Sequence, residues 1–64
     1  MSDPLIEALA EAVHDAYLEA AAEVGMPMDP AKQVPYRKLY AADKELTRAC
    51  VRAVLTELAA RAEA

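Results

Sequence analysis

Apolar residues recur at helical spacing near the beginning of the chain and predict a first long helix. Asp3 suits the N-cap position and Pro4 suits the first helical position. Gly25, the only glycine, is suited to end the helix in a left-handed conformation. The predicted helix therefore begins at Pro4 and stops at Gly25, and its core-facing strip consists of Leu5, Leu9, Val13, Ala16, Ala20 and Val24.

The other sides of this helix carry two further strips. Acidic residues recur every four positions and form a stripe of Glu7, Glu11, Asp15, Glu19 and Glu23. A second, partly apolar strip consists of Ala10, His14, Tyr17, Leu18 and Ala21. Because Leu18 is expected to be exposed, this second strip is interpreted as a contact surface, and His14 as a structural or interface residue. An alternative role for His14 is hydrogen bonding to a ligand or partner.

A proline-rich connector follows, from about Gly25 to Val34. Pro27 and Pro30 fix the backbone and remove donors, so the connector is expected to be ordered but irregular. Pro35 is expected to open a short helical turn that extends to Tyr40.

The second long helix is predicted to begin near residues 41 to 43 and to end at about Arg61. Its basic row, which steps by four, is expected to be a solvated face partly paired with Glu45. The alternative is contact with the acidic stripe, within or between chains. The fold prediction is all-α: a single domain over residues 1–64, with two long antiparallel helices joined by the connector. The apolar face of the second helix consists of Leu46, Cys50, Val51, Val54, Leu55 and Leu58, and its basic row of Lys44, Arg48 and Arg52.

The size of the chain favours self-association. With 64 residues, it is near the lower limit at which a domain is stable alone, and small scaffolds usually add a disulfide, a metal or a partner chain. Cys50 is the only cysteine and His14 the only histidine, so neither an intrachain disulfide nor a zinc finger can form. A dimer or higher homo-oligomer is therefore expected.

Charge is distributed unevenly along the chain. The formal net charge is −4, and the only net-positive region extends from residue 25 to residue 40. Overall acidity opposes binding to DNA or to an anionic membrane, and no apolar run reaches the roughly 18 residues of a transmembrane helix. No signal peptide is evident, and a lone thiol fits a reducing compartment, so a cytoplasmic location is expected.

The net-positive region places cations beside aromatic rings. Tyrosine can stack on a base and lysine or arginine can hold a phosphate, so a small anionic, nucleotide-type ligand suits this chemistry. The alternative is that the tyrosines cap the core while the cations are solvated. The residues concerned are Lys32, Tyr36, Arg37, Lys38 and Tyr40.

No pattern in the chain indicates catalysis. Glu11 and His14 have the Glu-x-x-His spacing of di-iron bundles, but Glu11 lies on the acidic side of its helix. Cys50 lies on an apolar helical face, where a thiol is usually inert. A glycine-rich phosphate loop and a metal-ligand cluster are both missing from the sequence. The chain is therefore not expected to be an enzyme or to need a metal or cofactor.

Three motifs, taken in order, resemble the ryanodine-receptor repeat (RyR) domain. The first is Leu-Ile-Glu-Ala-Leu-Ala-Glu-Ala-Val-His-Asp-Ala-Tyr, which ends at Tyr17 and contains a histidine followed three residues later by an aromatic. The second is Gly25. The third is the Val-Pro-Tyr-Arg-Lys-Leu turn that starts at Val34, with Lys44 and Arg48 downstream. The chain departs from the family pattern at Met26, where the family has tryptophan.

The resemblance implies a non-enzymatic helical module that senses a nucleotide-derived ligand. Free-standing versions occur in phages, so it also suggests a phage protein that sequesters a defence signalling nucleotide. In such a site the tyrosines stack, the cations hold phosphate and the histidine donates a hydrogen bond. The alternative hypothesis is a structural or adaptor module that pairs helices with itself or a partner. The predicted ligand-binding residues are His14, Tyr17, Tyr36, Lys38 and Arg48.

Overall fold

The computed structural model describes residues 3–63 and contains two long helices, α1 (Pro4–Val24) and α2 (Ala41–Ala62). Residues 1, 2 and 64 of the predicted domain lie outside the described residues. Two short 3-10 turns, η1 (Pro30–Lys32) and η2 (Tyr36–Lys38), lie in the connector, and the described residues include no strand. The all-α prediction, both long helices and the turn after Pro35 are therefore confirmed.

Both ends of α1 form as the sequence predicts. The Asp3 carboxylate accepts a hydrogen bond from the backbone N–H of Leu5 (2.8 Å) and thereby caps the helix. At the other end, Gly25 has a φ of 68°, and the N–H of Met26 donates to the carbonyl oxygen of Ala21 (2.9 Å). This left-handed glycine turns the chain out of α1 and into the connector.

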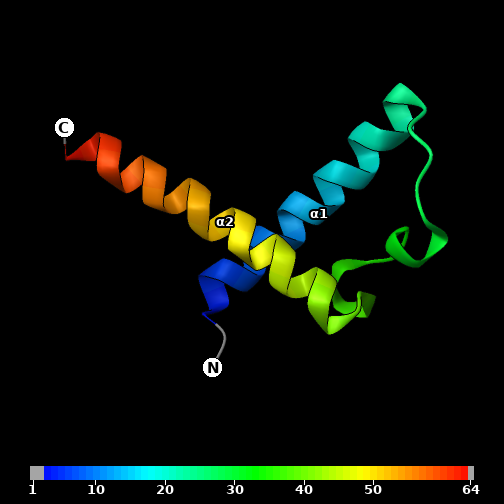
Figure 1. The fold of residues 1–64 in the computed structure, drawn as a ribbon, viewed down its shortest axis with the longest axis horizontal. Coiled ribbons are helices and arrows are strands. Elements are labelled where there is room, and N and C mark those ends of the chain that lie inside the picture. The colour runs from blue at the N-terminus through cyan, green and yellow to red at the C-terminus, as the bar shows by residue number, and fades with distance from the viewer. Residues whose placement is uncertain (1–2, 64) are drawn as a thin grey trace.

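The two helices cross like the strokes of an X, one lying over the other (Figure 1). The predicted antiparallel alignment is not observed, because the axes of α1 and α2 cross steeply instead of lying side by side (Figure 1). The reason is the length of the connector. Its 16 residues can span roughly 50 Å, more than the roughly 31 Å length of α1, so α2 need not run back along α1. The first turns of α2 lie beside the middle of α1, where Asp43 and Thr47 line one cleft with His14.

The core forms where the helices cross and where η2 packs beside them. Ala10 of α1 is fully buried, and its small side chain allows the two helices to approach closely. Val34 and two half-buried leucines pack around the buried residues. The core cluster consists of Ile6, Ala10, Tyr36, Leu39 and Val51, with Leu9, Val34 and Leu55 packed against it.

The side of α1 that faces the core differs from the predicted one. Val13 and Val24 of the predicted core strip are 46% and 74% exposed, whereas Ala10, His14 and Ala21 of the predicted contact strip are buried. The connector folds back and covers the His14 side of α1. The sequence pattern of α1 alone could not predict this contact. The strongest apolar strip of α1 is consequently left largely uncovered.

The apolar face of α2 is also only partly used. Val51 is buried and Leu55 is half-buried, but Leu46, Val54 and Leu58 are 66%, 59% and 58% exposed. Crossed helices touch over a short length, so residues away from the crossing lose their partner. Neither described helix has the length and hydropathy needed to cross a membrane.

Candidate functional site

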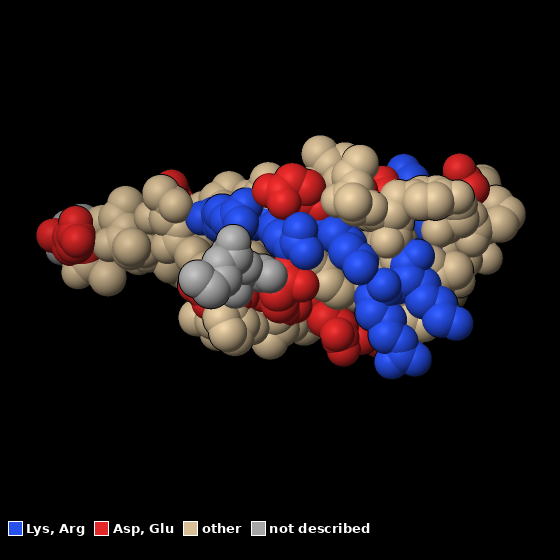
Figure 2. All heavy atoms as spheres, turned by 90° about the horizontal axis from the view of Figure 1, so that it is seen from below, with Lys and Arg blue, Asp and Glu red and all other residues tan. Residues whose placement is uncertain are grey.

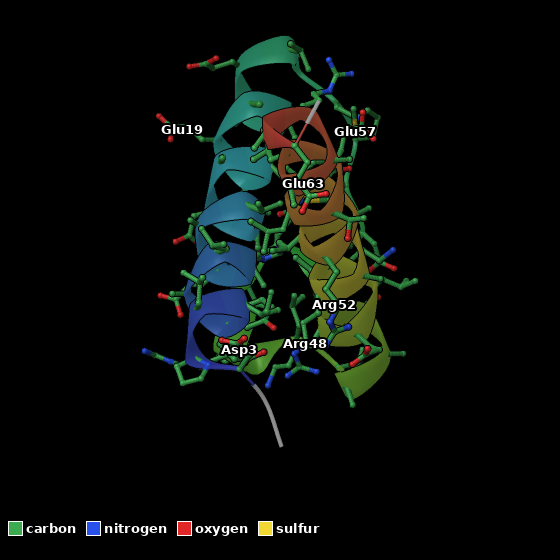
Figure 3. The ribbon with its side chains drawn as sticks, turned by 90° about the vertical axis from the view of Figure 1, so that its left-hand side faces the viewer. Asp3, Glu19, Arg48, Arg52, Glu57 and Glu63 are labelled. Carbon is green, nitrogen blue, oxygen red and sulfur yellow. The ribbon has the colours of Figure 1, made fainter. Side chains whose placement is uncertain are left out.

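Glu7 of α1 is the centre of a polar junction between three elements. The Arg48 guanidinium of α2 donates through Nε to Glu7 Oε1, and the Tyr36 hydroxyl of η2 donates to the same oxygen (3.2 Å). Figure 3 shows Arg48 reaching from α2 toward α1. Two of the five predicted ligand-binding side chains therefore bind a carboxylate of the chain itself.

The electrostatics of the junction favour the charged forms of its ion pair. The hydrogen bond from Arg48 holds the pKa of Glu7 below its ordinary value, and the hydrogen bond to Glu7 raises the pKa of Arg48. Burial raises the pKa of Tyr36, so this phenol stays protonated as a donor. The junction is thus a matched set of one acceptor and two donors.

The basic row of α2 has both kinds of partner that the sequence suggested. Arg48 and Arg52 each donate to Glu45, at 3.1 and 3.2 Å, while Arg48 also reaches Glu7 in the acidic stripe. Hydrogen bonds from Arg52 and then Arg48 lower the pKa of Glu45. Figure 2 shows Lys and Arg gathered in a row on this face, with acidic side chains on both sides. The cations beside these acids are therefore largely neutralised within the chain.

His14 is buried and has a structural partner. Its Nε2 donates to the backbone carbonyl oxygen of Val34 (2.7 Å), which ties α1 to the connector. Its ring centroid lies 6.4 Å from that of Tyr36, with the ring planes tilted by 55°. Predicted site residues His14, Tyr36 and Arg48 thus lie near one another, but their polar atoms point to Val34 and Glu7.

The two other predicted site residues lie apart from this junction. Tyr17 is half-exposed, and its hydroxyl donates to the sulfur of Met26 (3.8 Å). Lys38 is exposed at the end of η2. Tyr36 caps the core, whereas Tyr40 is 70% exposed, so the two tyrosines of the turn have different environments.

A cleft of about 280 Å³ lies between α1, the connector and α2. Its volume is just below the range of roughly 300–1,000 Å³ that is usual for small-molecule sites. The cleft has only one basic and one acidic side chain, and its lining is otherwise mostly apolar. The lining residues are Val13, His14 and Tyr17 of α1, Lys32 and Leu39 of the connector, and Asp43, Leu46, Thr47 and Cys50 of α2.

Sequence reasoning missed this cleft because its apolar residues were assigned to the core. Val13 and Leu46 have the spacing of core residues, and only the steep crossing of the helices leaves them exposed. It also missed Glu7 as the shared acceptor. The signal for Glu7 was its place in the acidic stripe, but the sequence did not show which cation reaches it.

No similarity to a known protein was found for this chain. Comparisons of the chain with protein-family models, curated proteins and solved structures gave no match. Within residues 3–63, no group of three or more His, Cys, Asp or Glu side chains is placed to hold a metal ion. The exposed thiol of Cys50 lies in the apolar cleft.

Proposed function

We propose that this chain is a non-enzymatic structural or adaptor module that acts by packing its apolar cleft against another polypeptide. The observation that carries the proposal is the exposure of side chains with core spacing on both helices. Val13 and Leu46 have core spacing but are 46% and 66% exposed, and together with Tyr17, which is 50% exposed, they line one cleft. Clustered exposed apolar groups mark protein contact sites.

The polar groups of the chain support an interaction module over a ligand sensor. Tyr36 and Arg48 bind Glu7, and His14 binds the Val34 carbonyl, so their donors serve the fold. Among residues 3–63, no buried side-chain nitrogen or oxygen is left without a partner. A buried polar group without a partner would have been a candidate ligand contact.

Titration of the isotope-labelled protein with a synthetic amphipathic helix of about 18 residues tests this proposal directly. We expect amide chemical shifts to change at the cleft residues Val13, Tyr17, Leu46 and Cys50. A peptide of identical composition, shuffled to remove its apolar face, is the control. Equal shifts with both peptides, or none at the cleft, would contradict the proposal.

The second proposal is the binding of a nucleotide-type ligand, as a short, free-standing RyR-like domain of phage or bacterial origin would do. The observation that favours it is that His14, Tyr17 and Lys32 all line the same cleft. Tyrosine offers a stacking surface and lysine a phosphate contact. Calorimetry with cyclic and NAD-derived nucleotides tests it, with Lys32→Gln as the variant. Absence of heat at millimolar ligand would rule this function out.

A further inference from the structure

The folded chain exposes more surface than a compact chain of its mass. Its accessible surface is 4948 Å², whereas a compact monomer of 6.9 kDa is expected to expose about 4,000 Å². Its radius of gyration is 13.2 Å, compared with about 10.7 Å for a typical domain of this length. The monomer therefore has about 900 Å² of surface beyond that of a closed fold.

The cause of the excess is the way the two helices meet. They cross, so each helix is covered near the crossing and bare toward its ends (Figure 1). The principal extents of 40, 30 and 15 Å describe a flat molecule whose thin direction holds the two stacked helices. A further layer is what normally covers such helix sides.

We propose that a second copy of this chain is that layer, bound as a two-fold symmetric dimer through the cleft between α1 and α2. This inference rests on the proposed function and names its partner. A standard interface buries about 800 Å² on each partner, so the excess of about 900 Å² is large enough to supply one, with the cleft at its centre and the bare helix sides next to it as the remainder. Val13, Tyr17, Leu46 and Cys50 form the apolar centre of the contact, and their counterparts in the second copy cover them.

The charges around the cleft are compatible with pairing of two acidic molecules. Each copy has a net charge of −4, so two copies repel one another through most of their surfaces. The cleft is different, because it has one cation and one anion, Lys32 and Asp43. A two-fold interface places the same patch on both sides, and the proposed dimer pairs Lys32 of each copy with Asp43 of the other. Glu11 and Asp15 of the acidic stripe line a separate depression beside Arg37.

Sedimentation equilibrium of the full chain over a range up to about 500 µM tests the dimer. We expect a mass approaching twice 6.9 kDa for the wild type. Leu46→Glu introduces a charge at the centre of the contact and is expected to raise the dissociation constant at least tenfold. Leu58→Glu is the matched control, because Leu58 lies on the same helix, is similarly exposed at 58%, and does not line the cleft. The control is expected to change the constant by less than about twofold.

Mixing two charge variants tests the symmetry without depending on the apolar substitution. Lys32→Glu and Asp43→Lys each place like charges opposite one another in their own homodimers. A mixed dimer restores both opposite-charge contacts, so native mass spectrometry is expected to find the mixed species in excess of random pairing by at least about threefold. Random pairing would overturn the two-fold arrangement.

The outcomes separate the dimer from the more general function. A wild-type monomer at about 500 µM overturns the dimer, and the function survives if the amphipathic helix still binds the cleft. An assembly that Leu58→Glu disrupts and Leu46→Glu leaves intact also overturns it. If neither a second copy nor the peptide binds the cleft, both proposals fail. Circular dichroism of each variant confirms that the helices are formed.

Discussion

Glu7 and Arg48, separated by 41 positions in the sequence, form the ion pair that joins the start of α1 to the N-terminal half of α2. Their side chains are 33% and 21% exposed, so the pair is partly shielded from water. Tyr36 donates to the same carboxylate and brings η2 into the contact. The three groups meet where the two helices pack together, and we predict that the pair helps to set the position of the crossing.

The stability of the fold is predicted to fall in acid. The pKa values of Glu7 and Glu45 are lowered in the folded chain, because Arg48 and Arg52 donate hydrogen bonds to the two carboxylates. A lowered folded-state pKa stabilises the fold above the unfolded-state pKa, and that contribution is lost as the pH falls through the folded-state pKa. The thermal midpoint is therefore expected to hold between pH 7 and about 5 and to decline below about 4.5.

The variant Glu7→Gln should reduce this acid dependence. Its thermal midpoint at pH 7 is expected to be lower than that of the wild type, and the difference should shrink as the pH falls and the wild-type Glu7 carboxylate becomes protonated. Glu19→Gln is the matched control, because Glu19 is exposed and points away from α2 (Figure 3). A pH profile of Glu7→Gln that parallels that of the wild type would show that the ion pair does not stabilise the fold.

Ala10 is predicted to be the position on α1 that tolerates a larger side chain least. It is fully buried at the helix crossing, so Ala10→Leu must displace α2 or η2 and is expected to cost about 1–3 kcal/mol or more. Ala12→Leu, on the exposed side of the same helix, makes the same chemical change and is expected to cost less than about 0.5 kcal/mol. Urea denaturation at one fixed protein concentration measures both. Similar losses at the two positions would contradict the position of the crossing.

The elements of this fold could be predicted from the sequence, but their arrangement could not. Asp3, Pro4 and Gly25 specify the ends of α1 through local backbone chemistry, and those ends are where the pattern placed them. Whether the Leu5–Val13 side or the Ala10–His14 side of α1 faces the core depends on where the connector packs. That is a long-range property, which the local pattern of α1 does not contain. The sequence analysis assigned Tyr36 and Arg48 to one predicted ligand site, but it did not predict that Glu7 binds both side chains.

His14 is predicted to act as a structural residue. His14→Ala leaves the Val34 carbonyl without its donor and opens a void beside the core, and is expected to cost about 2–4 kcal/mol. His14→Gln retains a side-chain N–H donor, so part of this loss should be recovered. Chemical denaturation measures the two losses, and hydrogen exchange at Met28 to Gln33 reports whether the connector has detached. Equal stability of His14→Ala and the wild type would exclude this role.

The two tyrosines of the turn are predicted to differ greatly in how much stability is lost when each is replaced. Tyr36 is 4% exposed, packs in the core and donates to Glu7, so Tyr36→Ala is expected to cost about 3–5 kcal/mol. Tyr40 is 70% exposed, so Tyr40→Ala is expected to cost less than about 0.5 kcal/mol, and Tyr36→Phe about 1 kcal/mol because only the hydroxyl is lost. Thermal and urea denaturation give the three values. A large loss for Tyr40→Ala with intact helices would instead place that ring in a contact between copies, since its side chain has little cover within the folded chain.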